Sequence, residues 1–434
     1  RYWIGRFSVK IRLECWTQFH LVVARICKAR KLLFDRLMVL YPVLTELIFR
    51  AARILAPAKS WLGTVAADKA WKQKEPLQGK VVWMHCASLG EFEMGKPILE
   101  GFLDNNPNWS GVVTFFSPSG YEPRKNYPRA TVHYLPLDAP SEVSKWLKYC
   151  NPSLAVFVRY DLWPNHIAGL KKFDVPTVVV GMSASKTPWY LSSMLPFIRG
   201  TFKAAVSIWG MVNDRDAATM SAAGIHSVVL GNPKYDYAAT LMNIELPEKF
   251  ERWSAAQEKP ILLVGSAHEM DAVVLAQSNH SCYSVWLVPH DLKEASKLSD
   301  AFNGKVSSSA TDEPHATNIL LIPEFGVLRS LYRVADAVIV GGGFGKATHN
   351  VLEATVQGKV VACGPHWQKI PENESLAAQG FLVPGAHHTD WTAYLERALQ
   401  GDFVHKEKEA RNWVLAQSGV CEKMIETLEQ AVEL

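Results

Sequence analysis

The sequence predicts an α/β protein made of two domains, each built around a parallel, doubly wound sheet. Three observations lead to this fold class. Short apolar runs rich in Val and Ile alternate with spacers of helix length, as expected when a helix connects each strand to the next. The 434 residues exceed what one hydrophobic core normally accommodates. The runs also fall into two series, which the turn-rich stretch 231–236 separates.

The N-terminal part of the chain differs in composition from the rest. The formal net charge is +4, but residues 1–70 contain 13 Lys and Arg against 4 Asp and Glu, so the remainder is acidic. Several of the 15 tryptophans lie near the N-terminus, where their amphipathic rings suit a membrane interface. We therefore assign residues 1–78 to a basic, apolar, helical segment that associates with a membrane.

Within this segment, residues 37–56 are strongly apolar but are interrupted by Glu46, Arg50 and Arg53. A helix that spans a bilayer needs about 20 predominantly apolar residues. The run is better suited to an amphipathic helix that lies in the surface of an anionic membrane. Its apolar positions are Leu44, Leu47, Ile48 and Ile54. The alternative is an ordinary helix packed on the protein.

The predicted domains are residues 79–230 and residues 231–390. Residues 391–434 are expected to form helices that pack back on the first domain. Seven scattered cysteines, of which Cys86, Cys150 and Cys363 fall in apolar patterns, predict reduced core residues rather than disulfides or a metal site.

The strands of the first series are followed by polar and small residues. They are predicted at 81–85, 111–116, 132–135, 154–158, 177–180, 206–211 and 228–230. Ligands of open parallel sheets bind beyond the carboxyl ends of the strands. The candidates there are Ser88, Gly90 and Glu91 after the first strand, Ser117 and Ser119 after the second, and Asp161 and Asn165 after the fourth.

The second series, at 261–265, 284–288, 318–321, 337–340 and 360–363, contains the most distinctive stretch of the chain. Three glycines, 341–343, follow the fourth run, and Gly345 and Lys346 come next. We expect a helix of about ten residues after them, capped by Thr348, with Leu352 and Val356 inward, and ended by Gly358. Glycines let the backbone approach a ligand closely, and a helix N-terminus offers free N–H groups. Both features suit a phosphate.

A structural turn is the alternative interpretation of this glycine stretch. Polar side chains in the first predicted helical turn, namely His349, Asn350 and Glu353, favour a ligand site, because a purely structural turn does not need them. The pattern of the two domains together is that of a transferase with a nucleotide-bound donor on one side.

Several motifs then appear in a fixed order. They are ASLGE at 87–91, FFSPSG at 115–120, DLWPN at 161–165, GNPKYD at 231–236, GSAHE at 265–269, GGGFGKATHNVLEA at 341–354 and GPH at 364–366. Together they resemble the 3-deoxy-D-manno-octulosonic acid (Kdo) transferases of Gram-negative bacteria, over roughly residues 39–400. The FGKATHN form of the loop looks like that of the Bacteroidetes branch.

This resemblance implies a GT-B fold, with two Rossmann-like domains facing a cleft. It implies an enzyme at the cytoplasmic face of the inner membrane that transfers Kdo from CMP-Kdo to a lipid A precursor, without a metal or another cofactor. The first domain would bind the acceptor and the second the CMP-sugar donor. CMP is a good leaving group once its phosphate charge is held by amides and by Lys346 or Lys234.

Residue by residue, Glu91 matches the general base of the family, which would activate the acceptor hydroxyl in an inverting displacement. Acceptor contacts are implied for Ser88, Gly90, Ser117, Ser119, Asp161 and Asn165. Donor contacts are implied for Lys234, Ser266, His268, Glu269, His290, Gly342, Gly343, Gly345, Lys346, Asn350 and Glu353. The sequence departs from the family at Asp161, where a glutamate is usual, and Arg159 stands two residues before it.

Three other functions remain as alternatives. One is a GT-B enzyme that uses a UDP-sugar, either a transferase or a non-hydrolysing epimerase. The second is a nucleotide-binding dehydrogenase, which is disfavoured because the glycine stretch lacks GxGxxG spacing. The third is a non-catalytic, membrane-associated protein that binds nucleotide sugars. A nucleic-acid partner is disfavoured because the basic residues cluster with apolar ones.

Overall fold

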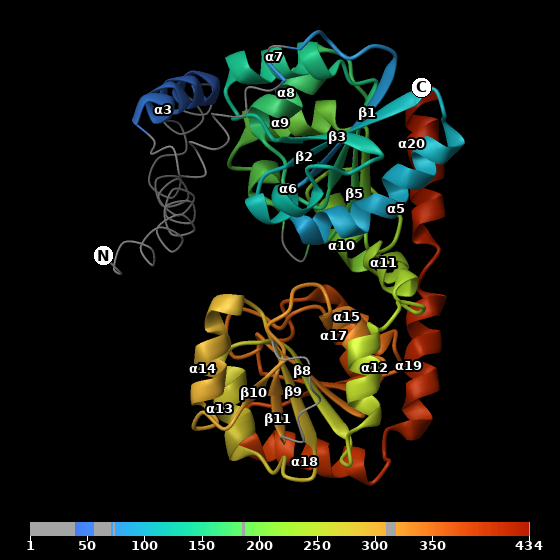
Figure 1. The fold of residues 1–434 in the computed structure, drawn as a ribbon. Coiled ribbons are helices and arrows are strands. Elements are labelled where there is room, and N and C mark those ends of the chain that lie inside the picture. Colours follow the sequence, from blue (N-terminus) through green and yellow to red (C-terminus); the bar gives the residue numbers. More distant parts are fainter. Residues whose placement is uncertain (1–39, 56–70, 73, 185–186, 310–317, 434) are drawn as a thin grey trace. The chain divides into compact units, whose positions relative to one another are not determined.

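The computed structural model describes residues 40–55, 71–72, 74–184, 187–309 and 318–433. Most of the predicted membrane segment, residues 1–39 and 56–70, lies outside the described residues, as do the side chains of Arg53 and Ile54. The chain divides into two compact units (Figure 1). Unit 1 contains the residues up to Asn232 and those from Val420 onward, and unit 2 comprises Pro233–Gly419.

Unit 1 is built on a seven-stranded parallel sheet with the strand order β3-β2-β1-β4-β5-β6-β7. Its strands are β1 (Lys80–Cys86), β2 (Trp109–Phe115), β3 (Ala130–Tyr134), β4 (Leu154–Val158), β5 (Thr177–Met182), β6 (Ile208–Met211) and β7 (Val228–Val229). Its helices are α3 (Tyr41–Leu55), α5 (Leu89–Asn105), α6 (Pro118–Arg124), α7 (Pro140–Cys150), α8 (Pro164–Lys172), η1 (Trp189–Leu191), α9 (Pro196–Ala205), α10 (Asp214–Ala222) and α20 (Val420–Glu433). The order reverses between β1 and β4, where doubly wound sheets bind ligands.

The central strands of unit 1 are buried on both faces, which explains their unbroken apolar runs. In β1, Val81 and Trp83 enter one core cluster, while Val82 and Met84 enter the other. The alternation follows from the two-residue period of a strand.

Unit 2 repeats this plan with the strand order β10-β11-β9-β8-β12-β13-β14, which reverses between β8 and β12. Its strands are β8 (Ile261–Ala267), β9 (Ser284–Pro289), β10 (Ser307–Ser308), β11 (Ile319–Leu321), β12 (Ala337–Val340), β13 (Val361–Cys363) and β14 (Leu382–Pro384). Its helices are α11 (Lys234–Thr240), α12 (Glu248–Ala255), α13 (Glu269–Gln277), η2 (Leu292–Glu294), α14 (Ala295–Asp300), α15 (Leu328–Leu331), α16 (Leu352–Thr355), α17 (Pro371–Ala378), α18 (His388–Leu399) and α19 (Val404–Ala416). The predicted α/β class therefore holds for both units.

The prediction for residues 391–434 is wrong for most of that segment. Helix α18 buries Trp391 and Leu395 in unit 2, and the Tyr394 hydroxyl donates to the Val360 carbonyl oxygen at 2.8 Å. Helix α19 also belongs to unit 2. In the described chain beyond residue 390, only α20 returns to unit 1, where Met424 is buried. The apolar faces of α18 and α19 complete the core around the unit 2 sheet.

Helix α3 packs on unit 1 next to α7 (Figure 1) through its polar side. The Tyr41 hydroxyl donates to Asp138 Oδ2 at 2.8 Å, and the Ser141 hydroxyl donates to Glu46 Oε1 at 2.7 Å. The opposite side of α3 and the residue before it expose apolar side chains, namely Leu40, Val43, Leu44, Leu47 and Ile48. None of the helices in the described part of the chain has the length and hydropathy needed to cross a bilayer.

Candidate functional site

Glu91 lies in the first turn of α5, directly beyond the carboxyl end of β1. Ser88 precedes the helix in an extended conformation, and its hydroxyl donates to Glu91 Oε2. The Glu91 side chain is only partly buried, so a ligand can reach its carboxylate. A partly exposed carboxylate in this position is suited to accept a proton from a hydroxyl group.

The neighbouring Glu93 has a different role. Its side chain is 9% exposed and forms an ion pair with Arg124 on α6. The two glutamates of this turn are therefore distinguished by geometry, since Glu93 joins two helices and Glu91 does not. This supports the choice of Glu91 as the reactive residue.

The loops that follow β1 and β2 are in contact, which brings several predicted residues together. The Ser117 N–H donates to the Ala87 carbonyl oxygen at 2.9 Å. Ser117 caps α6 by accepting from the Ser119 N–H at 3.2 Å, and Ser119 is exposed. Gly90 is also exposed, and a Cβ atom there would meet only Ser88 Oγ, at 3.8 Å. Ser88, Gly90, Glu91, Ser117 and Ser119 thus share one edge of the sheet.

Asp161 joins this edge through His85, which we did not predict as a site residue. His85 Nε2 lies 3.1 Å from Asp161 Oδ2, and His85 Nδ1 lies 3.0 Å from Thr114 Oγ1. The Trp83 indole N–H donates to the same threonine oxygen at 2.8 Å. These contacts link β2, β1 and the loop after β4, and they fix the orientation of the Asp161 carboxylate. A histidine at the end of an otherwise apolar strand was the available signal.

The contact of Asn165 with the acceptor stays a prediction, and the structure shows that its amide nitrogen is already bonded inside the protein. Asn165 is buried, and its Nδ2 donates to Thr45 Oγ1 at 2.9 Å and to the Asp138 carbonyl oxygen at 2.6 Å. Both amide hydrogens therefore hold α3 and the loop after β3 against α8, and neither is available to a ligand.

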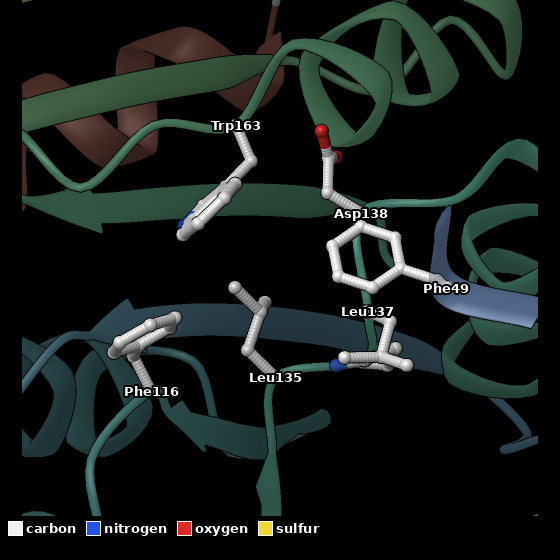
Figure 2. Close-up of a pocket in the computed structure, with 7 residues that line it drawn as sticks. Phe49, Phe116, Leu135, Leu137, Asp138 and Trp163 are labelled. Carbon is white, nitrogen blue, oxygen red and sulfur yellow. The ribbon is translucent and has the colours of Figure 1, made fainter. Parts of the chain in front are cut away.

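An apolar pocket lies at the same edge of unit 1 (Figure 2), and the sequence analysis missed it. In Figure 2, Phe49 projects from α3 toward Leu137 and Asp138. The rings of Phe116 and Trp163 are stacked, with centroids 5.5 Å apart. The full lining is Phe49, Phe116, Leu135, Pro136, Leu137, Asp138 and Trp163. Phe116 and Trp163 belong to the FFSPSG and DLWPN motifs, which were the available signal.

In unit 2, Gly342 and Gly343 of the stretch 341–345 pack closely against neighbouring parts of the protein and are buried. The Gly342 N–H donates to Asp271 Oδ2 at 3.0 Å, and its φ of +88° favours glycine. A Cβ atom on Gly343 would lie 2.6 Å from the backbone of Gly364. The Gly342 amide is therefore already bonded inside the protein, and the contact of Gly342 with the donor stays a prediction. Gly345 and Lys346 are exposed and remain accessible.

The predicted helix of about ten residues is also wrong, because α16 contains only four residues. Thr348 does not cap it; instead, Asn350 Oδ1 accepts from the Leu352 N–H at 3.2 Å. So short a helix adds little dipole, since the macrodipole is a sum over aligned peptides. The predicted end at Gly358 is wrong as well, because α16 ends at Thr355 with Val356 as its C-cap; Gly358, with φ of +85°, lies in the turn that follows.

Glu353 and Asn350 lie together as predicted. Asn350 Nδ2 donates to Glu353 Oε1 at 3.2 Å, and Arg329 Nε lies 3.5 Å from the same oxygen. The Tyr237 hydroxyl is 3.5 Å from it as well. The carboxylate is thus held in a fixed position from which it can accept hydrogen bonds from a ligand hydroxyl.

The other predicted donor residues have partners of their own. Lys234 pairs with the buried Glu372, so its charge is largely compensated. Glu269 pairs with Lys297 at 2.9 Å. Ser266 has a left-handed φ of +50° at the irregular end of β8. His268 and His290 lie close together, with ring centroids 4.9 Å apart, and His349 joins them.

Residues 60–237 match the model of a protein family described as 3-deoxy-D-manno-octulosonic-acid transferase (kdotransferase). This part of the chain is similar to a Kdo transferase domain. The match spans most of unit 1, including Glu91, and it confirms the resemblance that the motifs indicated.

Similarity to individual proteins extends into unit 2. The chain is 27% identical over 384 residues to a 3-deoxy-D-manno-octulosonic acid transferase of Chlamydophila psittaci, covering 79% of this chain and 86% of the relative. It is 26% identical over 356 residues to the Haemophilus influenzae protein of the same name, covering 77% and 82%. The assignment to the Bacteroidetes branch stays a prediction.

Solved structures with a similar fold include a glycosyltransferase from Rickettsia africae, with a TM-score of 0.56 and 13% identity over 82% of this chain and 99% of that one. A UDP-GlcNAc 2-epimerase from Neisseria meningitidis, bound to UDP-GlcNAc, also has a TM-score of 0.56, with 14% identity over 81% of this chain and 100% of that one. At these identities the likeness concerns the fold alone. It confirms the predicted GT-B class.

Proposed function

We propose that the protein is a glycosyltransferase that moves Kdo from CMP-Kdo to a lipid A precursor in lipopolysaccharide biosynthesis. The observation that carries this proposal is the similarity, over most of both chains, to relatives named 3-deoxy-D-manno-octulosonic acid transferases. The position of Glu91, partly exposed at the start of α5, agrees with it.

In this scheme Glu91 is the general base. Its carboxylate takes the proton of the acceptor hydroxyl, the hydroxyl oxygen bonds to the anomeric carbon of Kdo, and the bond from that carbon to the CMP phosphate oxygen breaks with inversion. CMP leaves with the electron pair of the broken bond. The Ser88 hydroxyl, which donates to Glu91 Oε2, holds the carboxylate in place. A positioned base of this kind contributes about 10²–10⁴-fold to a rate.

The donor is assigned to unit 2. The Glu353 carboxylate, fixed by Asn350, is placed to accept hydrogen bonds from the ribose hydroxyls. Lys346 is exposed and is the better candidate for the phosphate charge, because Lys234 is already paired with Glu372.

The acceptor and the membrane are assigned to unit 1. Helix α3 contacts the protein through the polar groups of Tyr41 and Glu46 and through the Phe49 ring, while other apolar side chains of the helix face outward, with Leu47 59% and Ile48 50% exposed. An ordinary surface helix has the opposite orientation, with its apolar side inward. We therefore assign the exposed side of α3 to the cytoplasmic surface of the inner membrane. The apolar pocket between α3 and Trp163 lies at the same edge of the sheet.

The test of the proposed function is a transfer assay with CMP-Kdo and a tetra-acylated lipid A precursor, with the products read by mass spectrometry. We expect addition of Kdo to the lipid, and inhibition by CMP that UDP does not reproduce. If UDP displaces the bound nucleotide better than CMP does, the protein is instead an enzyme that uses a UDP-sugar.

The membrane assignment has its own test, flotation with vesicles that contain anionic lipids. We expect the wild-type protein to float with the vesicles and Leu47→Glu to bind them clearly less. Val404→Glu is the control, since Val404 is an exposed apolar residue of α19, in unit 2. Equal flotation of all three proteins would remove α3 as the membrane contact.

A further inference from the structure

Three histidines from distant parts of the sequence meet at the carboxyl edge of the unit 2 sheet. His268 follows β8, His290 follows β9, and His349 comes after β12 and the glycine stretch; β9, β8 and β12 are adjacent strands. One ring nitrogen from each lies within 4.8 Å of the others. We propose that these three imidazoles bind a divalent transition-metal ion such as Zn²⁺.

The spacing of the nitrogens is close to what a metal requires. Zn–N bonds of about 2.0–2.1 Å in a tetrahedral site place ligand nitrogens about 3.3 Å apart. His268 Nε2 and His349 Nε2 are 2.8 Å apart and share a hydrogen bond, whose proton a bound metal ion would displace, and the largest separation in the cluster does not exceed 4.8 Å. The observed distances therefore bracket the required one, and shifts of the rings by roughly 1–2 Å suffice.

The rings also have to turn. The planes of His268 and His349 differ by 16°, and those of His290 and His349 by 21°, so the lone pairs do not yet converge on one point. Rotation about the bond to a histidine ring has a broad energy profile and costs little. His290 is exposed, which leaves it room to move.

The groups around the cluster hold the ligands in place. Glu294 Oε2 lies 3.0 Å from His268 Nδ1, which fixes the proton on that nitrogen and leaves the Nε2 lone pair for a metal. Asp271 Oδ2 accepts the N–H groups of His268 at 2.9 Å and Gly342 at 3.0 Å, so one carboxylate joins the loops after β8 and β12. The His290 N–H donates to the Ala267 carbonyl oxygen at 3.0 Å.

This inference goes beyond the proposed function and contradicts the expectation, drawn from the resemblance, that no metal is involved. Three protein ligands leave a fourth tetrahedral position for water or an anionic oxygen. Metal binding is measured without donor or acceptor, so its failure would leave Kdo transfer untouched.

The test uses the full chain without a histidine tag, stripped of metal by a chelator and titrated with Co²⁺, whose visible absorption reports a tetrahedral site. We expect one equivalent to bind and Zn²⁺ to displace it. His290→Ala and His349→Ala should each weaken binding by about 100-fold, and Glu294→Gln by about 10-fold. His405→Ala, at an exposed position on α19, should bind as the wild type does.

Two results would overturn the proposal. One is the absence of saturable binding by the wild-type protein. The other is unchanged binding in His290→Ala. This variant carries the test even if His349→Ala lowers the stability of unit 2, because His290 is exposed and its loss leaves the core intact.

Discussion

The carboxyl edges of the two sheets occupy the same topological position but carry different chemistry. In unit 1, the loop after β1 leads into α5, a helix of 17 residues that presents Glu91. In unit 2, the loop after β12 leads into α16, which has four residues, and the amide of Gly342 is bonded to Asp271. A glycine-rich turn therefore marks close backbone packing as readily as a ligand site.

The largest expected effect is the loss of transfer activity on substitution of Glu91, at the carboxyl edge of the unit 1 sheet. Glu91→Gln removes the proposed base and retains the shape of the side chain, so transfer should fall by about 10²–10⁴-fold. Binding of CMP should stay the same, because the residues proposed to bind the donor lie in unit 2. Single-turnover transfer and CMP titration measure the two properties.

The matched control for this change is Glu122→Gln, at an exposed position on α6. It should transfer at the wild-type rate. A Glu91→Gln variant that keeps most of its activity would assign the base to another residue.

The second effect separates structure from ligand binding in unit 2. Lys234→Met leaves the Glu372 carboxylate, which is 1% exposed, without its ion-pair partner. Breaking a buried pair in this way costs about 3–5 kcal/mol, whereas Lys125→Met, at the exposed pair with Glu122 in unit 1, should cost less than about 1 kcal/mol. Urea unfolding measures both. Unchanged stability of Lys234→Met with weakened CMP binding would restore the lysine as a donor contact.

The third effect tests the glycine stretch itself. Gly343→Ala places a methyl group against the backbone of Gly364 and should lower the free energy of unfolding by about 1–3 kcal/mol. Gly345→Ala, at an exposed position where the nearest atom to a Cβ is 3.4 Å away, should change stability much less. Thermal unfolding compares the two. Similar stability in both variants would mean that the packing of the two loops is not tight.

The smallest effect has the opposite sign and lies in unit 1. Gly90 has no close neighbour, and in a helix alanine is favoured over glycine by about 0.5–1 kcal/mol. Gly90→Ala should therefore raise the stability of the protein. If the acceptor approaches the backbone here, kcat/KM for the lipid should fall at the same time. A variant that is both more stable and fully active would remove Gly90 from the acceptor site.

Much of the fold could be predicted from the sequence, because buried parallel strands read as continuous apolar runs. Val338 and Ile339 of β12, for example, are fully buried on opposite faces of the sheet. The meeting of Ser88, Glu91 and Ser117 followed from the adjacency of β1 and β2.

What could not be predicted depends on which hydrogen-bonding groups are already used inside the protein. Asn165 and Gly342 stand in motifs that suggest ligand binding, yet Asp138 and Asp271 consume their donors. The triad of His268, His290 and His349 was equally hidden, since each histidine is separate in sequence and only the strand order β9-β8-β12 joins them.

The return of α20 to unit 1 has a consequence for synthesis. The buried side chains of Met424 and Leu428 belong to the core of unit 1, yet they are translated only after all of unit 2. During elongation, the apolar surface of α5 that receives them faces solvent while about 190 further residues emerge, and exposed apolar surface of this kind favours aggregation. Unit 2, which is continuous in sequence, can mature first. The first half of the chain to leave the ribosome is thus the last to be completed.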